Sequence, residues 1–196
     1  MNFDGLFPSP VWWEKTNIDT SLLEQYAYKT QFEDTIGNKI SNVGGWQSKN
    51  ILGLSMITNE LEGKILDMTH QALNAYSYDQ TNIEPYIANL WININKKGHS
   101  NSVHIHGGCF LSGVFYIKAK PDQGGVSFFK DFNKAFIDDI LPFKEVNAIN
   151  VSQVVYKCET GKIITFPGYL PHDVKPNETD EDRISAAWNI KLRAKK

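Results

Sequence analysis

The chain has 196 residues, enough for one hydrophobic core, and its 41% hydrophobic and 21% charged residues are typical of a folded globular protein rather than a disordered one. A formal net charge of −2 offers no basic surface for nucleic acid or an anionic membrane. The two cysteines lack metal-finger spacing, and neither a signal peptide nor a run of 18 apolar residues occurs, so we expect a cytoplasmic single domain without disulfides or membrane spans.

The first 85 residues are predicted to form a helical and strap-like region. Prolines in the aromatic segment 3–13 disfavour a helix there, which favours an edge strand or a covering arm. The segment Asp19–Ser21 can cap a first helix that ends near Phe32.

A loop over 37–45 and a short strand or strap over 46–54 follow, and Asn59 is predicted to cap a second helix. Apolar residues recur in that helix at spacings of three and four: Leu61, Ile65, Met68, Ala72 and Tyr76. This spacing predicts one buried face, packed against the outside of a sheet.

After Pro85 the pattern changes to alternation, which is typical of a strand. One face carries apolar residues: Ala88, Leu90, Ile92 and Ile94. The other face carries Asn89, Trp91, Asn93 and Asn95. A polar face with so few charges fits a strand that lines a pocket, although a plain edge strand would look similar. Trp91, Asn93 and Asn95 are therefore candidate substrate contacts.

Further strands are predicted over 110–119, 126–129, 151–157, 162–168 and 183–192, with a long loop over 133–148. About seven or eight short strands separated by turn signals favour an antiparallel sandwich or barrel. We expect one domain, 1–196, with an N-terminal region over 1–85 and a β core over 86–196.

A His-x-His pattern, His104 and His106, lies between these strands. Val103 and Ile105 alternate with the histidines, so an extended backbone directs both imidazoles to one face. Neutral imidazoles suit iron, zinc, copper or nickel, although a surface pair or a structural zinc half-site has the same pattern. We do not count two other histidines as ligands, because His70 is predicted within the second helix, at the edge of its apolar stripe, and His99 in an exposed turn.

Three residues downstream can complete a site. His172 follows a strand end, and Arg183 and Ser185 share the less apolar face of the last strand. A buried arginine needs an anionic partner, which a small-molecule carboxylate can supply. The alternative is that Arg183 pairs at the surface with the acidic run 180–182.

The order of these motifs resembles that of the iron(II)- and 2-oxoglutarate-dependent oxygenases. The resemblance rests on His-x-His, Phe115-Tyr116-Ile117, Gly124-Gly125, Phe128-Phe129, Phe166-Pro167, His172, Val174, Pro176, Arg183 and Ser185. A small group within that superfamily is also similar over Leu6-Phe7-Pro8, Gly45-Trp46-Gln47-Ser48 and Ser112-Gly113-Val114-Phe115-Tyr116. The resemblance implies a mainly β fold, a double-stranded β-helix (jelly roll, cupin-like) with N-terminal helices outside its major sheet.

The resemblance also implies roles for individual residues. His104, His106 and His172 become the metal ligands, and Arg183 with Ser185 anchors the distal carboxylate of 2-oxoglutarate. Tyr116 is a further cosubstrate contact or a core residue, and Asp173 is a residue that supports His172 or an exposed turn carboxylate. The implied activity is a dioxygenase that uses Fe(II), O2 and 2-oxoglutarate, hydroxylates a substrate and releases succinate and CO2.

One residue departs from the family pattern, because His106 stands where most members have Asp or Glu. Three neutral histidines can hold the same face of an ion, but its double positive charge stays unbalanced by the ligands. Two alternatives therefore remain: a three-histidine cupin-like metal enzyme that does not use 2-oxoglutarate, and a non-catalytic metal- or ligand-binding module. The substrate, an ascorbate requirement and the oligomeric state, with a homodimer as one option, are not readable from the sequence.

Overall fold

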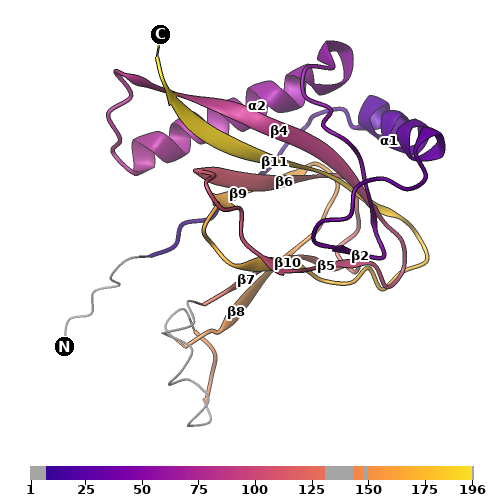
Figure 1. Ribbon diagram of the computed structural model, residues 1–196. Coiled ribbons are helices and arrows are strands. Elements are labelled where there is room, and N and C mark those ends of the chain that lie inside the picture. Colours follow the sequence, from indigo (N-terminus) through magenta and orange to yellow (C-terminus); the bar gives the residue numbers. More distant parts are fainter. Residues whose placement is uncertain (1–7, 131–143, 148–149, 196) are drawn as a thin grey trace.

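The computed structural model describes residues 8–130, 144–147 and 150–195. Figure 1 shows two facing sheets, with both helices on the outer side of the larger sheet. No helix in these ranges is long and apolar enough to cross a membrane.

Every strand in the two sheets pairs with its neighbours in antiparallel fashion. The larger sheet has the order β1 (Trp12–Lys15), β9 (Lys162–Pro167), β6 (Leu111–Lys118), β11 (Arg183–Ala194), β4 (Ile83–Asn95) and β3 (Trp46–Gln47). The smaller sheet has the order β2 (Asn42–Val43), β5 (Ser100–His104), β10 (His172–Val174), β7 (Gly125–Phe129) and β8 (Gln153–Lys157).

Strands β4 to β11 cross repeatedly between the two sheets. Strands β9, β6, β11 and β4 form the centre of one sheet, and β5, β10, β7 and β8 make up most of the other. This is a double-stranded β-helix, so the predicted fold is confirmed. The inner faces of the two sheets enclose the space in which the predicted site residues meet.

The main hydrophobic core lies between the helices and the larger sheet. Helices α1 (Ser21–Glu33) and α2 (Ser55–Ala75) pack onto the outer face of that sheet. The buried residues of this core include Leu23, Ala27, Leu61, Ile65, Met68, Ala72, Ile92, Ile94, Ile184, Ala186 and Trp188. The spacing of four of them in α2 confirms the predicted buried face, whereas Tyr76 follows the end of the helix and is 37% exposed.

The predicted start of the second helix is wrong. Asn59 lies inside α2, which begins four residues earlier at Ser55. The carbonyl of Leu54 accepts hydrogen bonds from the backbone N–H groups of Ile57 and Thr58, and the Thr58 hydroxyl also donates to it. The first turn is therefore closed around Leu54, without a side-chain cap from Asn59.

The other predictions for the N-terminal region agree with the structure only in part. The predicted edge strand corresponds to β1, at the end of the larger sheet, while residues 3–7 lie outside the described ranges. Within the predicted strap only Trp46–Gln47 pairs as a strand, and the predicted loop over 37–45 contains β2. Most of the predicted loop over 133–148 also lies outside the described ranges.

We expect Gly113→Ala to destabilise the fold, because a methyl group there would overlap with the ring of buried Trp188 and the carbonyl of Ile164. Overpacking of this kind lowers the free energy of unfolding by about 1–3 kcal/mol. Gly63→Ala is the matched control, since Gly63 lies in α2 with no atom within 4 Å of the added carbon. Urea denaturation measures both variants, and equal stability of Gly113→Ala and wild type would contradict this packing.

Candidate functional site

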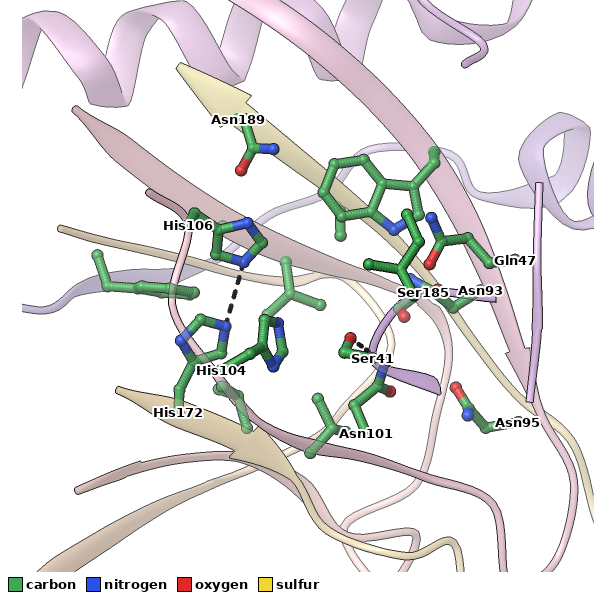
Figure 2. A pocket seen from close by; sticks show the side chains of 18 of the residues that line it. Ser41, Gln47, Asn93, Asn95, Asn101, His104, His106, His172, Ser185 and Asn189 are labelled. Carbon is green, nitrogen blue, oxygen red and sulfur yellow. Dashed lines mark hydrogen bonds between the residues drawn. The ribbon is translucent and has the colours of Figure 1, made fainter. Parts of the chain in front are cut away.

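Three imidazoles converge on the inner side of the smaller sheet (Figure 2). His104 ends β5 directly opposite His172, which begins β10. His106 approaches from the loop after β5, and one ring nitrogen of each of the three residues lies within 4.8 Å of the others. The Nε2 atoms of His106 and His172 are 3.2 Å apart.

Backbone carbonyls hold two of the rings in place. Nδ1 of His104 lies 2.7 Å from the Ser102 carbonyl oxygen, and Nδ1 of His172 lies 2.9 Å from that of Leu170. A neutral ring that donates from Nδ1 keeps a lone pair on Nε2. In both residues the nitrogen that remains free to bind a metal is therefore Nε2.

The environment keeps the buried histidines neutral. Burial is the main cause that lowers the pKa of His172 to about 3 and that of His106 to about 4, and the nearby His104 lowers both further. At neutral pH these two rings therefore offer lone pairs instead of positive charge, as a metal ligand must.

The extended backbone predicted for the His-x-His pattern ends at His104, and His106 lies in the loop that follows. Strand β5 ends at His104, because the backbone N–H of His106 donates to the Gly168 carbonyl, 2.8 Å away. The N–H of Gly168 in turn donates to the carbonyl of Phe110. These bonds tie the loop that carries His106 to the loop that leads to His172.

The donor set fits a first-row transition metal. Three neutral imidazoles suit iron, zinc, copper or nickel, whereas calcium and magnesium prefer oxygen ligands. Ligand atoms at about 2.1 Å from one ion lie about 3 to 4 Å apart, and the 3.2 Å between the His106 and His172 nitrogens matches that separation. Among the described residues, His70 and His99 belong to no such cluster.

A cavity of about 190 Å³ opens beside the histidines. It is lined by Ile40, Ser41, Gln47, Asn89, Trp91, Asn93, Asn95, Asn101, His104, His106, Gly113, Val114, Tyr116, Val126, Phe166, His172, Val174, Ser185, Ala187 and Asn189. All three candidate substrate residues are present, and the Trp91 ring centroid is 6.3 Å from that of His106. None of these lining residues carries a carboxylate, ammonium or guanidinium group.

Paired residues of strands β4 and β11 follow one another along the cavity wall. Four cross-strand pairs face inward, from one end of the wall to the other: Asn95 with Arg183, Asn93 with Ser185, Trp91 with Ala187, and Asn89 with Asn189. Successive pairs are about 6.6 Å apart along a strand. Figure 2 shows Asn189 on the side of His106 and Asn95 on the far side.

Arg183 is buried, and no carboxylate of the described residues pairs with it. Its side chain is on the inward face of β11, although it does not line the cavity itself, and it is 1% exposed. Nη1 donates to the carbonyls of Gln123 and Lys175, whereas Nη2 is buried with no partner among the described residues. An unpaired guanidinium nitrogen can donate a hydrogen bond to an anionic ligand.

The alternative partners of Arg183 are engaged elsewhere. Asp180 pairs with Lys97, Glu181 pairs with Lys120, and Asp182 accepts a hydrogen bond from the hydroxyl of Tyr28. The predicted surface alternative for Arg183 is therefore wrong.

Two other predicted residues differ in their placement. Tyr116 is buried in the cavity wall, where its hydroxyl accepts a hydrogen bond from the N–H of Val126 and burial raises its pKa. Asp173 pairs with Lys175 at 2.9 Å, and within the described residues no hydrogen bond joins it to a histidine. It therefore gives the ligands no direct support.

The sequence analysis missed several polar residues of the wall: Ser41, Gln47, Asn89, Asn101 and Asn189. Asn89 shares the alternating face of Trp91, and Asn189 that of Ser185, so alternation contained a signal for both. Ser41 comes from the predicted loop over 37–45 and Gln47 from the predicted strap over 46–54, and no alternation there indicates that either faces a cavity.

One family model covers the part of the chain that contains most of these residues. The family model described as "Putative 2OG-Fe(II) oxygenase" matches residues 89–189, more than half of the chain. None of the curated proteins matches the sequence.

Solved structures share the fold at low sequence identity. A prolyl-4-hydroxylase from Pseudomonas putida is 14% identical, with a TM-score of 0.61 and 93% of each chain covered. The viral collagen prolyl hydroxylase of Paramecium Bursaria Chlorella virus-1, in its 2OG complex, is 14% identical with a TM-score of 0.58, covering 92% of this chain and 94% of that one. HygX from Streptomyces hygroscopicus, with nickel and 2-oxoglutarate bound, is 11% identical with a TM-score of 0.58, covering 93% and 83%.

These structures establish the fold, and the family model establishes the family. The cluster of His104, His106 and His172 could hold a metal ion. The chain therefore belongs to the 2OG-Fe(II) oxygenases, which use Fe(II) and 2-oxoglutarate.

Proposed function

We propose that this oxygenase is a hydroxylase, a dioxygenase that couples conversion of 2-oxoglutarate to succinate and CO2 with hydroxylation of a substrate. One observation carries the proposal: a cluster of three imidazoles and a buried arginine with an unpaired Nη2 occur within one β-helix, and the described lining of its cavity has no carboxylate, ammonium or guanidinium group. A cytoplasmic location and a homodimer stay predictions.

His104, His106 and His172 are the residues that we propose as iron ligands. The carbonyls of Ser102 and Leu170 orient two of the rings, so that their Nε2 lone pairs are available. The iron supplies the activation of dioxygen that links the oxidation of the two substrates. Burial keeps the rings of His106 and His172 neutral, and all three rings lie at the wall of the cavity.

Arg183, Ser185 and Tyr116 are the residues that we propose for the distal carboxylate of 2-oxoglutarate. The free Nη2 of Arg183 can donate to a carboxylate oxygen, and this bond would remove the unpaired buried nitrogen. The Tyr116 hydroxyl accepts from Val126, so its own proton remains available to donate. The hydroxyl of Ser185 lies on the same inward face, one pair closer to the histidines.

Trp91, Asn93 and Asn95 are the proposed substrate contacts. Trp91 is the one beside His106, at the place where a substrate must approach the metal. Asn93 and Asn95 lie further toward Arg183, and Oδ1 of Asn93 is buried without a partner in the described structure. An amide wall of this kind favours a substrate group that forms hydrogen bonds.

A second candidate function is a three-histidine metal enzyme that does not use 2-oxoglutarate. The absence of a carboxylate from the described ligand cluster favours it. In that enzyme Arg183 would bind a carboxylate of the substrate. Titration of the metal-loaded protein with 2-oxoglutarate separates the two candidates, because only the proposed oxygenase binds it.

Replacing any ligand should weaken metal binding and stop turnover. We expect His104→Ala, His106→Ala and His172→Ala each to weaken Co(II) binding at least tenfold and to stop succinate release with Fe(II), since each removes one of three donors. His70→Ala is the control, because His70 is exposed on α2 and bonded to Gln80. Metal titration and a succinate assay measure these effects, and an absence of succinate at every iron level in the wild type would overturn the proposal.

Replacing the arginine should affect the cosubstrate alone. We expect Arg183→Gln to weaken 2-oxoglutarate binding by about 10- to 100-fold, the loss of one charged hydrogen bond, with unchanged Co(II) stoichiometry. Arg193→Gln is the control, because Arg193 is exposed on the same strand and paired with Glu84. Calorimetric titration measures both affinities, and unchanged 2-oxoglutarate binding in Arg183→Gln would refute the assigned role.

A further inference from the structure

The described lining of the cavity contains no negative side chain that could balance a metal ion. The three proposed ligands are imidazoles, which bind a metal as neutral donors. The carboxylate nearest to the ligands in sequence, Asp173, is paired with Lys175. Strand alternation also directs its side chain away from that of His172. A dication bound here therefore receives no compensating charge from these residues.

The surroundings make such a charge costly. His172 is 3% exposed, so a charge placed at its ring lies largely out of reach of water. The guanidinium of Arg183 adds a second positive group on the same inner face. Isolated charges in a protein interior are unfavourable unless an opposite charge accompanies them.

We propose that His106, because it is a neutral ligand, leaves the cosubstrate to balance the positive charge of the metal ion. The site therefore binds the metal ion weakly when it is alone and tightly when 2-oxoglutarate is bound with it. This inference rests on the proposed function. The dianion offers one carboxylate to the metal and one to Arg183. His106 thereby sets the division of binding free energy between metal and cosubstrate, and the protein retains its metal best when 2-oxoglutarate is present.

The first test uses the unmodified protein. Co(II) is titrated with and without saturating 2-oxoglutarate, with correction for Co(II) bound by 2-oxoglutarate in buffer. We expect the cosubstrate to tighten Co(II) binding at least tenfold. Since coupling is reciprocal, Co(II) must tighten 2-oxoglutarate binding by the same factor. A factor below two overturns the inference.

The second test isolates the charge of the ligand. His106→Asp and His106→Asn introduce side chains of nearly equal size that differ by one negative charge. Relative to His106→Asn, we expect His106→Asp to bind Co(II) alone at least tenfold more tightly and, once loaded with Co(II), to bind 2-oxoglutarate at least threefold more weakly. Damage to the fold would weaken both, so only a charge effect moves the two affinities in opposite directions.

His70→Asp is the control for a charge added elsewhere, because His70 is exposed on α2 and outside the described cavity wall. Its two affinities should equal those of the wild type. Parallel changes in the two His106 variants, or no difference between them, overturn the inference. The proposed function fails separately, when wild-type protein loaded with Co(II) does not bind 2-oxoglutarate at all.

Discussion

The pairing of β4 with β11 is the constraint on which the site depends. The two strands stay in register from Asn95 opposite Arg183 to Ile83 opposite Ala194, with one irregularity beside Asn189. Because side chains alternate between faces, this register gives Ile92, Ile94 and Trp188 to the helix-covered core and the intervening residues to the cavity. A slip of one residue would exchange the two sets and destroy core and site together.

A second constraint is the shortage of negative charge around the site. The acidic residues closest to Arg183 in sequence all pair with other side chains, so its guanidinium keeps an unpaired nitrogen. The histidines provide lone pairs without charge. The histidines and Arg183 border a space that favours an anion able to reach both of them. Binding and catalysis thus share one electrostatic requirement.

Periodicity is the reason why much of this arrangement is predictable. Alternation over 88–95 and 183–192 predicts which side chains face inward, because it depends only on the local strand backbone. The start of α2 is less predictable, since Asn59 resembles a cap whereas the real first turn forms around the carbonyl of Leu54. Long-range contacts are not predictable in this way. Neither the pairing of β2 with β5 nor the position of Gln47 in the cavity wall has a local signal.

The backbone bonds between the two ligand loops have a further consequence. The hydrogen bonds of His106 and Phe110 with Gly168 are formed by the polypeptide alone, and so are the carbonyl contacts of His104 and His172. The entropic cost of bringing the three rings together is therefore part of folding, before any ion binds. This distinguishes the protein from small zinc domains, which unfold when a chelator removes their metal. Here chelation should leave a folded apoprotein that takes up metal again without refolding.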